Sequence, residues 1–260
     1  MSSDTVSEII VDKDGFIGRL KISNIAKHNS LNFDMWASIP SKLQELADDP
    51  QIRVIVLQGD GEKAFASGSD ISQFQQRRSS VEDVGVYNRT VEAAVHALSN
   101  IKKPTIAHIK GYCFGGGVGI ALHCDLRYAD ETALFCIPAA KVGVGYHPAW
   151  LQRLTWLVGP ARAKEMMFTA GRYNVKQAQQ MGLINDIVGP DAFNDLIASL
   201  IALAPLSQLA SKLSIDQSTS LLGFDHELCA EAVTNCFNSA DYIEGRSAFT
   251  EKRSPKFTAS

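Results

Sequence analysis

Three consecutive glycines, Gly115, Gly116 and Gly117, form the most chemically suggestive stretch of the chain. They follow a short apolar segment, 104–109, that is typical of a buried strand, and they precede a run of small residues that favours a helix. Backbone without side chains lets a ligand approach closely, and the unpaired N–H groups at a helix start favour negative charge. The pattern predicts a receptor for an oxyanion or a phosphate.

A second loop of small residues, Ala66–Ile71, follows another apolar run, Arg53–Gln58. Continuous apolar runs are expected for strands that are covered on both faces. Two such loops at the ends of neighbouring strands can each aim one backbone N–H at the same point. That arrangement would form an oxyanion hole, which stabilises charge developing on a carbonyl oxygen.

Other motifs that bind phosphates or metals are missing from the sequence. The glycine cluster lacks the spacing of a dinucleotide fingerprint, and no P-loop, HExxH or GxSxG pattern occurs. The five cysteines are scattered, without a CxxC pair, which favours a reduced compartment over disulfides or zinc. We therefore expect no metal site.

The composition indicates one soluble domain, with room for a small appendage. The 260 residues are 45% hydrophobic and 20% charged, and the net charge of −3 argues against nucleic acid as the main partner. No apolar run approaches the length of a membrane span, and the first residues lack the pattern of a signal peptide. The expected location is the cytoplasm, with no membrane partner.

The order of elements indicates an α/β fold with parallel strand pairing. Two β-prone runs at 6–11 and 16–22 flank a turn predicted at 12–15, and a helix with an internal proline is predicted at 33–47. The chain then alternates strand, loop and helix, which implies right-handed crossovers between parallel strands. Further helices are predicted at 82–98, 150–157, 161–169 and 175–181, brief strands at 133–137 and 185–188, and mostly helix from 191 onward.

Taken together, these stretches resemble the crotonase (enoyl-CoA hydratase/isomerase) superfamily over nearly the whole chain. The stretches that carry the resemblance are KHNSLN at 27–32, ASGSDI at 66–71, the segment 103–125, GLIN at 182–185 and EGRSAFTEKRSPKF at 244–257. The resemblance implies a spiral of β-β-α repeats in residues 1–200 and a C-terminal helical region, 201–260, for trimerisation. It also implies a lyase or isomerase of fatty acid metabolism that acts on an acyl-CoA thioester without a separate cofactor, as a homotrimer or a dimer of trimers.

The resemblance also assigns site residues. It implies that the amides of Ser69 and Gly116 grip the thioester oxygen, which would stabilise a thioester enolate. The CoA moiety is expected along the loop of Ala66, Ser67, Gly68, Asp70 and Ile71, with Lys27 near its phosphates and Phe249 and Lys252 reaching a neighbouring subunit's site. From the residues alone, Asp70 could instead cap a helix start.

Two positions depart from the pattern of the superfamily's hydratases, which work with two glutamates. Gly119 stands where the first glutamate would fall, and Ala139 stands where the second would fall. Neither side chain can transfer a proton, and general acid–base catalysis contributes ~100- to 10,000-fold per group. The ordinary hydration mechanism is therefore not expected.

The loop at 142–150 offers the nearest ionisable side chains, Tyr146 and His147. Tyr146 matches a tyrosine of superfamily decarboxylases, and it could bind a leaving carboxylate or protonate an enolate. His147 matches the position of a nucleophilic aspartate in a dehalogenase branch, and it could act as an acid or a base. The open alternatives are an acyl-CoA decarboxylase, a thioester hydrolase with His147 activating water, and a non-catalytic acyl-CoA-binding protein, with RNA binding disfavoured by the acidic balance.

Overall fold

The computed structural model describes residues 7–70, 81–219 and 223–260 and contains two β-sheets. The larger sheet has the order β1-β2-β3-β5-β7-β10, and the smaller has the order β4-β6-β8-β9. The first six strands in chain order are β1 (Glu8–Asp14), β2 (Ile17–Ser23), β3 (Val54–Gly59), β4 (Ala64–Ala66), β5 (Thr105–Ile109) and β6 (Tyr112–Phe114). They are followed by β7 (Leu126–Ala129), β8 (Leu134–Cys136), β9 (Arg172–Asn174) and β10 (Asp186–Ile187).

The sheets are built from a β-β-α unit that occurs three times in succession. In each unit the first strand joins the larger sheet, the second joins the smaller sheet, and a helix follows. The helices of the three units are α3 (Val81–Ser99), α4 (Gly116–Leu122) and α5 (Ala139–Val142). Neighbouring first strands pair in parallel, as do neighbouring second strands. This confirms the predicted spiral of β-β-α repeats.

Two short strands of the smaller sheet, β4 and β6, occupy segments that the sequence pattern indicated only as loop and glycine-rich turn. Each has three residues, which is too short for an apolar alternation to stand out. Both lie directly before the loops of interest, so they fix where those loops begin.

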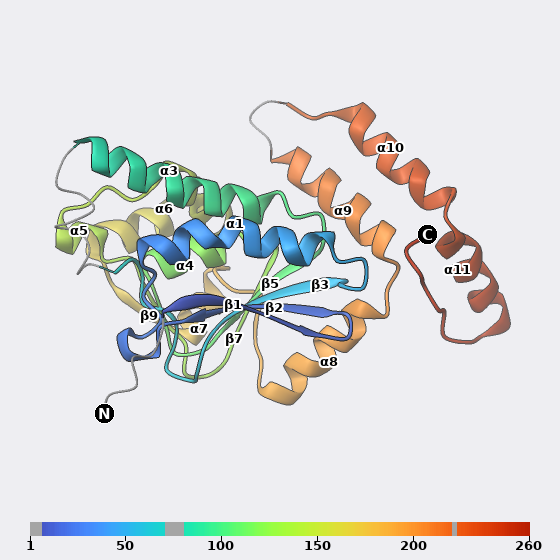
Figure 1. The fold of residues 1–260 in the computed structure, drawn as a ribbon, viewed down its shortest axis with the longest axis horizontal. Helices are drawn as coiled ribbons and strands as arrows, with labels where there is room; N and C mark the ends of the chain where they lie inside the picture. Colours follow the sequence, from blue (N-terminus) through green and yellow to red (C-terminus); the bar gives the residue numbers. More distant parts are fainter. Residues whose placement is uncertain (1–6, 71–80, 220–222) are drawn as a thin grey trace.

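The helix α1 (Phe33–Asp48) lies beside α3, and both extend over the sheets in Figure 1. The Asn32 side chain accepts a hydrogen bond from the Met35 N–H and so caps the start of α1. Trp36, Leu43 and Leu46 are fully buried on its inner face. The helix continues through Pro40 to Asp48, which confirms the helix predicted at 33–47.

The hairpin at the start of the chain differs from its predicted form. β1 runs on to Asp14, and the reversal occurs at Gly15 and Phe16 instead of over 12–15. The pairing of Asp14 with Ile17 makes this a tight turn, and Gly15 takes a φ of +57° there. Composition placed the turn correctly within about three residues but could not show that the acidic residues belong to the strand.

The remaining helices follow the predicted order. They are the short 3-10 turn Ile25–Lys27, α6 (Pro148–Thr169), α7 (Val175–Gln180), α8 (Pro190–Ile201), α9 (Pro205–Ser218), α10 (His226–Phe237) and α11 (Ala240–Glu251). The two helices predicted at 150–157 and 161–169 form one element that is kinked at Gly159, where φ is +76°. In Figure 1, α10 and α11 extend to one end of the molecule and α5 lies at the other.

In the described part of the chain, no single helix is both long and apolar enough to cross a membrane. The consecutive helices α8 and α9 pass that test only as a pair, by length and composition, and they are bent by 99°.

Candidate active site

The loop after β4 is held by the segment that precedes α1. The Leu31 N–H donates to the Gly68 carbonyl and the Asp70 N–H donates to the Leu31 carbonyl, each at 2.8 Å. Gly68 has a φ of +107°, which favours glycine. Because its two neighbours make these bonds, Ser69 lies between them with its own N–H turned away from Leu31.

The loop after β6 brings a second amide to the same place. Gly115 has a φ of +49°, and its N–H donates to the Cys136 carbonyl at 2.9 Å. A Cβ placed on Gly116 would lie 3.4 Å from the Ser69 nitrogen, so the two loops meet there. In the ranges that the structure describes, neither the Ser69 nor the Gly116 N–H donates to another protein group. Both amides are available to a ligand.

These amides open onto a cavity of about 420 Å³. Its lining is dominated by apolar and aromatic side chains from α3, α5, α6 and the loop between α5 and α6. The described lining residues include no aspartate or glutamate. They are Ser67, Gly68, Ser69, Tyr87, Asn88, Val91, Gly115, Gly116, Ile137, Pro138, Ala139, Val142, Val144, Gly145, Tyr146, His147, Pro148 and Trp150.

The space beside Gly119 is filled by the indole ring of Trp150. A Cβ on Gly119 would lie 2.6 Å from Trp150 Cδ2, which is closer than carbon atoms approach. Trp150 also stacks on Trp36, with ring centroids 6.2 Å apart and planes 25° apart. Ala139 is buried at the start of α5 and lines the same cavity. An aromatic and aliphatic floor, formed by Trp150 and Ala139, therefore occupies the side of the cavity at the two positions that depart from the hydratase pattern.

Tyr146 contacts the glycine turn itself. Its hydroxyl donates to the Gly115 carbonyl at 2.9 Å, and its ring packs edge-on against Trp150 with centroids 4.9 Å apart. Burial raises the pKa of Tyr146 well above its ordinary value, so the hydroxyl keeps its proton at neutral pH. The hydroxyl proton of Tyr146, which from the sequence could serve a leaving carboxylate or an enolate, is donated to a backbone carbonyl of the protein.

His147 caps the start of α6. Its Nδ1 accepts a hydrogen bond from the Ala149 N–H at 3.3 Å. A ring nitrogen that accepts a hydrogen bond carries no proton, so in this arrangement the hydrogen of the neutral imidazole lies on Nε2. His147 thus offers the cavity a hydrogen-bond donor.

The residues expected to hold CoA are only partly brought together. Ser67 and Gly68 line the cavity, while Ala66 ends β4 just before them. Lys27 lies on the neighbouring 3-10 turn and pairs with Asp70, with Nζ 2.8 Å from Oδ2. This ion pair gives Asp70 a partner other than a helix start. Ile71 lies outside the described residues.

Phe249 and Lys252 are not near this cavity in the same chain. Phe249 is on α11 and is 88% exposed, and Lys252 ends that helix with a φ of +54°. In Figure 1, α11 lies at the end of the molecule opposite α5. Their expected role toward a neighbouring subunit stays a prediction.

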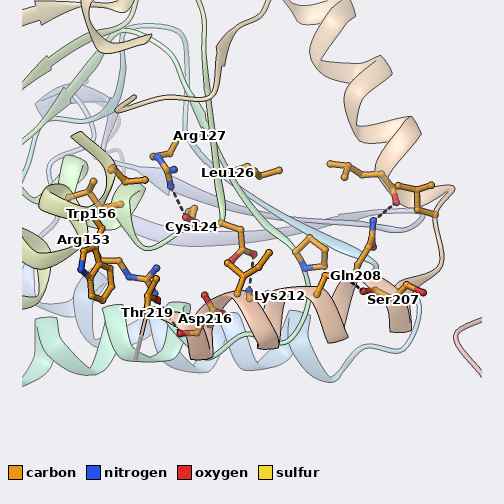
Figure 2. A pocket seen from close by; sticks show the side chains of 18 of the residues that line it. Cys124, Leu126, Arg127, Arg153, Trp156, Ser207, Gln208, Lys212, Asp216 and Thr219 are labelled. Atoms are coloured by element: carbon orange, nitrogen blue, oxygen red, sulfur yellow. Dashed lines mark hydrogen bonds and ion pairs between the residues drawn. The ribbon is translucent and has the colours of Figure 1, made fainter. Parts of the chain in front are cut away.

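A larger cavity of about 780 Å³ lies between α9 and the α/β body (Figure 2). Lys212 of α9 reaches Asp125 there, with Nζ 2.8 Å from Oδ2, and Arg153 lies over the Trp156 ring. Its lining includes neither Ser69 nor Gly116. Size alone therefore does not identify the site, since the convergent N–H groups lie in the smaller cavity.

Side-chain clusters that could hold a metal ion are missing from the described parts of the chain. Tyr87, Val91, Val144 and Trp150 line the candidate cavity and were not singled out from the sequence as site residues. No local sequence signal points to Trp150, because its contact with Gly119 joins positions 31 residues apart.

Comparison with known proteins decides the family. The family model described as enoyl-CoA hydratase/isomerase matches residues 12–260. The chain belongs to the enoyl-CoA hydratase/isomerase family. It is 33% identical to a crotonyl-CoA hydratase of Syntrophomonas wolfei over 258 residues, which cover 96% of this chain and 97% of that protein.

Relatives with a different activity are nearly as similar. The chain is 31% identical to a peroxisomal Delta(3,5)-Delta(2,4)-dienoyl-CoA isomerase of Arabidopsis thaliana, with 98% of both chains covered. Among solved structures, an enoyl-CoA hydratase/isomerase family protein from Hyphomonas neptunium superposes with a TM-score of 0.91 at 31% identity, covering 97% of this chain and 98% of that one. The family and fold implied by the sequence are confirmed, and the protein is an enzyme of the hydratase/isomerase family.

Proposed function

We propose that this enzyme binds an acyl-CoA with its thioester oxygen between the Ser69 and Gly116 amides and forms a thioester enolate there by decarboxylation. The observation that carries the proposal is the contrast within one cavity. At one end of the cavity, two N–H donors without partners among the described residues converge. The described lining residues provide no carboxylate that could act as a general acid or base. Such donors stabilise negative charge on oxygen without reorganising.

Decarboxylation suits this cavity because it needs no catalytic base. A carboxylate on the α-carbon loses CO₂, and the electron pair of the broken C–C bond moves into the enolate, whose charge rests on the thioester oxygen. An apolar environment disfavours the carboxylate and therefore favours this transfer of charge toward the two N–H groups. A proton from solvent water added to the α-carbon completes the reaction, and the hydroxide that remains combines with the released CO₂ as bicarbonate.

His147 fits the role of a donor better than that of a base. While Nδ1 accepts the Ala149 N–H, Nε2 carries hydrogen and cannot remove a proton from water. We assign its Nε2–H to the substrate carboxylate. Thioester hydrolysis would need the opposite tautomer, which would break the bond to Ala149.

The proposed substrate also includes CoA along Ala66, Ser67 and Gly68, with Lys27 toward its phosphates. No cofactor beyond CoA itself is required by this chemistry. The proposed location is the cytoplasm.

We further propose that the chain assembles as a homotrimer or a dimer of trimers through residues 201–260. The support is the apolar surface that α9, α10 and α11 expose, in which Ile215, Phe237, Ile243 and Phe249 are each more than half exposed. Ile215 also lines the cavity of Figure 2, between α9 and the α/β body. Sedimentation equilibrium would show the mass of three or six chains, whereas a monomer would contradict the assembly.

The test of the reaction is a mass-spectrometric screen of acyl-CoAs in water labelled with ¹⁸O, including crotonyl-CoA, methylmalonyl-CoA and aromatic esters. Loss of CO₂ with no ¹⁸O in the acyl-CoA product supports decarboxylation. Label in a hydroxyacyl-CoA means hydration, label in a freed acid means hydrolysis, and binding without turnover means a non-catalytic role; each of these contradicts the proposal.

The matched variants for the oxygen-binding step are Gly116→Pro and Gly116→Ala. Proline at the first helical position is compatible with the backbone but removes the N–H, whereas alanine keeps it. An added Cβ would lie 3.2 Å from the Trp36 ring in both variants, so alanine controls for this contact, while the ring carbons Cγ and Cδ are added by proline alone. We expect turnover to fall ~100- to 1,000-fold in Gly116→Pro, the usual effect of losing one such donor, and to be largely kept in Gly116→Ala.

A further inference from the structure

The peptide that carries the Gly116 N–H also carries the Gly115 carbonyl. In a trans peptide these two groups point in opposite directions in one plane, so holding the carbonyl aims the N–H. The Gly115 carbonyl accepts two hydrogen bonds, from the Gly119 N–H at 3.0 Å and from the Tyr146 hydroxyl at 2.9 Å. Both lone pairs of this oxygen are therefore used on the side away from the ligand.

The other oxyanion donor is held in a similar way, but by backbone. The Ser69 N–H shares its peptide with the Gly68 carbonyl, which accepts from the Leu31 N–H at 2.8 Å. Among the described residues, Tyr146 is the one side chain that donates to either of these two carbonyls. Its contribution can therefore be removed without altering the backbone.

We propose that Tyr146 is a positioning residue that orients and polarises the Gly115–Gly116 peptide, so that the Gly116 N–H becomes a stronger donor to the thioester oxygen. A hydrogen bond to an amide carbonyl draws electron density from the nitrogen and makes its N–H more acidic. Such cooperative strengthening amounts to roughly 10–30% per bond. This role rests on the proposed function of Gly116, and it replaces direct proton transfer by Tyr146.

Two features make Tyr146 suited to this role. The ring is fixed edge-on against Trp150, which limits the positions that the hydroxyl can take. The pKa of Tyr146 is raised well above its ordinary value by burial, so the hydroxyl donates throughout the range in which the enzyme would work.

The experiment measures the infrared carbonyl frequency of acetyl-CoA, labelled with ¹³C at the thioester carbonyl, when bound to the full chain. Hydrogen bonds to this oxygen lower its stretching frequency. We expect Tyr146→Phe to lose roughly 5–15% of the downshift seen with the unaltered chain, because the cooperative contribution of roughly 10–30% acts on one of the two hydrogen bonds to the oxygen. Tyr128→Phe, which removes a hydroxyl on β7 away from the cavity, is expected to leave the downshift unchanged.

Gly116→Pro separates this proposal from the one on which it rests. If Gly116→Pro loses much of the downshift and Tyr146→Phe keeps all of it, the positioning role is wrong and the oxyanion hole stands. If Gly116→Pro keeps the full downshift, the oxyanion hole itself is wrong. A Tyr146→Phe variant that loses turnover with an unchanged downshift would indicate direct proton transfer and overturn the positioning role.

A second measurement covers the case in which Tyr146→Phe does not fold. Replacing the tyrosines by 3-fluorotyrosine keeps each ring and hydroxyl but makes the hydroxyl a stronger donor. The downshift of bound acetyl-CoA is then expected to increase. An unchanged downshift in the fluorinated chain overturns the proposal.

Discussion

The two sides of the cavity are built in different ways. The oxygen-binding side consists of backbone packed on backbone: a Cβ on Gly117 would lie 2.3 Å from the Ala66 carbonyl oxygen. The opposite side, the aromatic floor formed by Trp150 over Gly119 with Ala139, consists of side chain packed on backbone. The first arrangement can be occupied only by glycine. The aromatic floor depends on which side chain fills the space over Gly119. Substitutions can therefore be accommodated at the floor by changing that side chain, but not on the oxygen-binding side, where the opposing atoms are backbone.

The largest effect is expected from Gly117→Ala. Its methyl group would push the loops of Ser69 and Gly116 apart, and no side chain can move to relieve the contact because the opposing atom is a carbonyl oxygen. Overpacking of this kind costs about 3 kcal/mol or more in the free energy of unfolding. Urea denaturation measures it.

The control is Gly145→Ala, at a glycine with no atom within 4 Å of an added Cβ. It should leave stability nearly unchanged. Equal stability of the Gly117→Ala and Gly145→Ala variants would show that the oxygen-binding side is not the rigid one.

A smaller effect is expected from Gly119→Ala, because it clashes with a side chain. Alone it should cost about 1–3 kcal/mol. In a Trp150→Leu background the same change should cost little, since the indole ring is no longer there. A double-mutant cycle by urea denaturation is expected to give a coupling free energy of about 1 kcal/mol or more, and strictly additive effects would contradict direct contact between residues 119 and 150.

The features that the sequence predicted well are those that depend on local pattern. The apolar run of β3 and the three glycines after β6 indicated the two loops, and the parallel pairing of the strands followed from their alternation with helices. The meeting of Ser69 with Gly116 was inferred from resemblance and from neighbouring strands. The geometry of this meeting is set by β4 and β6, which lead into the two loops. Both strands are too short to be recognised from sequence periodicity.

The aromatic floor could not be predicted because it depends on distant packing. Nothing in the sequence near Gly119 shows that Trp150, 31 residues further along, covers it. For the same reason the sequence suggested a substrate group as a possible partner of the Tyr146 hydroxyl but could not point to the Gly115 carbonyl, with which the structure pairs it.

The last expected effect, which is absent at neutral pH, concerns His123 at the end of α4, where Nδ1 lies 2.8 Å from the Gly119 carbonyl oxygen. Burial lowers the pKa of His123 to about 4, from an ordinary value of 6.5. Above pH 6.5 both folded and unfolded chains hold a neutral imidazole, so the contribution to stability is complete. As the pH falls toward 4 the unfolded chain binds a proton first, and stability on the order of 3 kcal/mol is lost.

Urea denaturation between pH 7 and pH 4 measures this loss. Burial also lowers the pKa of His108 to about 4, so His123→Gln is expected to remove only part of the pH dependence. His96→Gln, on an exposed face of α3, serves as the control. A pH dependence that is the same in all three chains would contradict a buried neutral His123.

The contact between Gly119 and Trp150 also constrains how the sequence can change over evolution. A glutamate at position 119 has no room while the indole ring of Trp150 lies over that helix, so it is accommodated only after residue 150 has become smaller. Placing an acidic side chain at position 119 therefore requires two substitutions, and the first of them must be at residue 150.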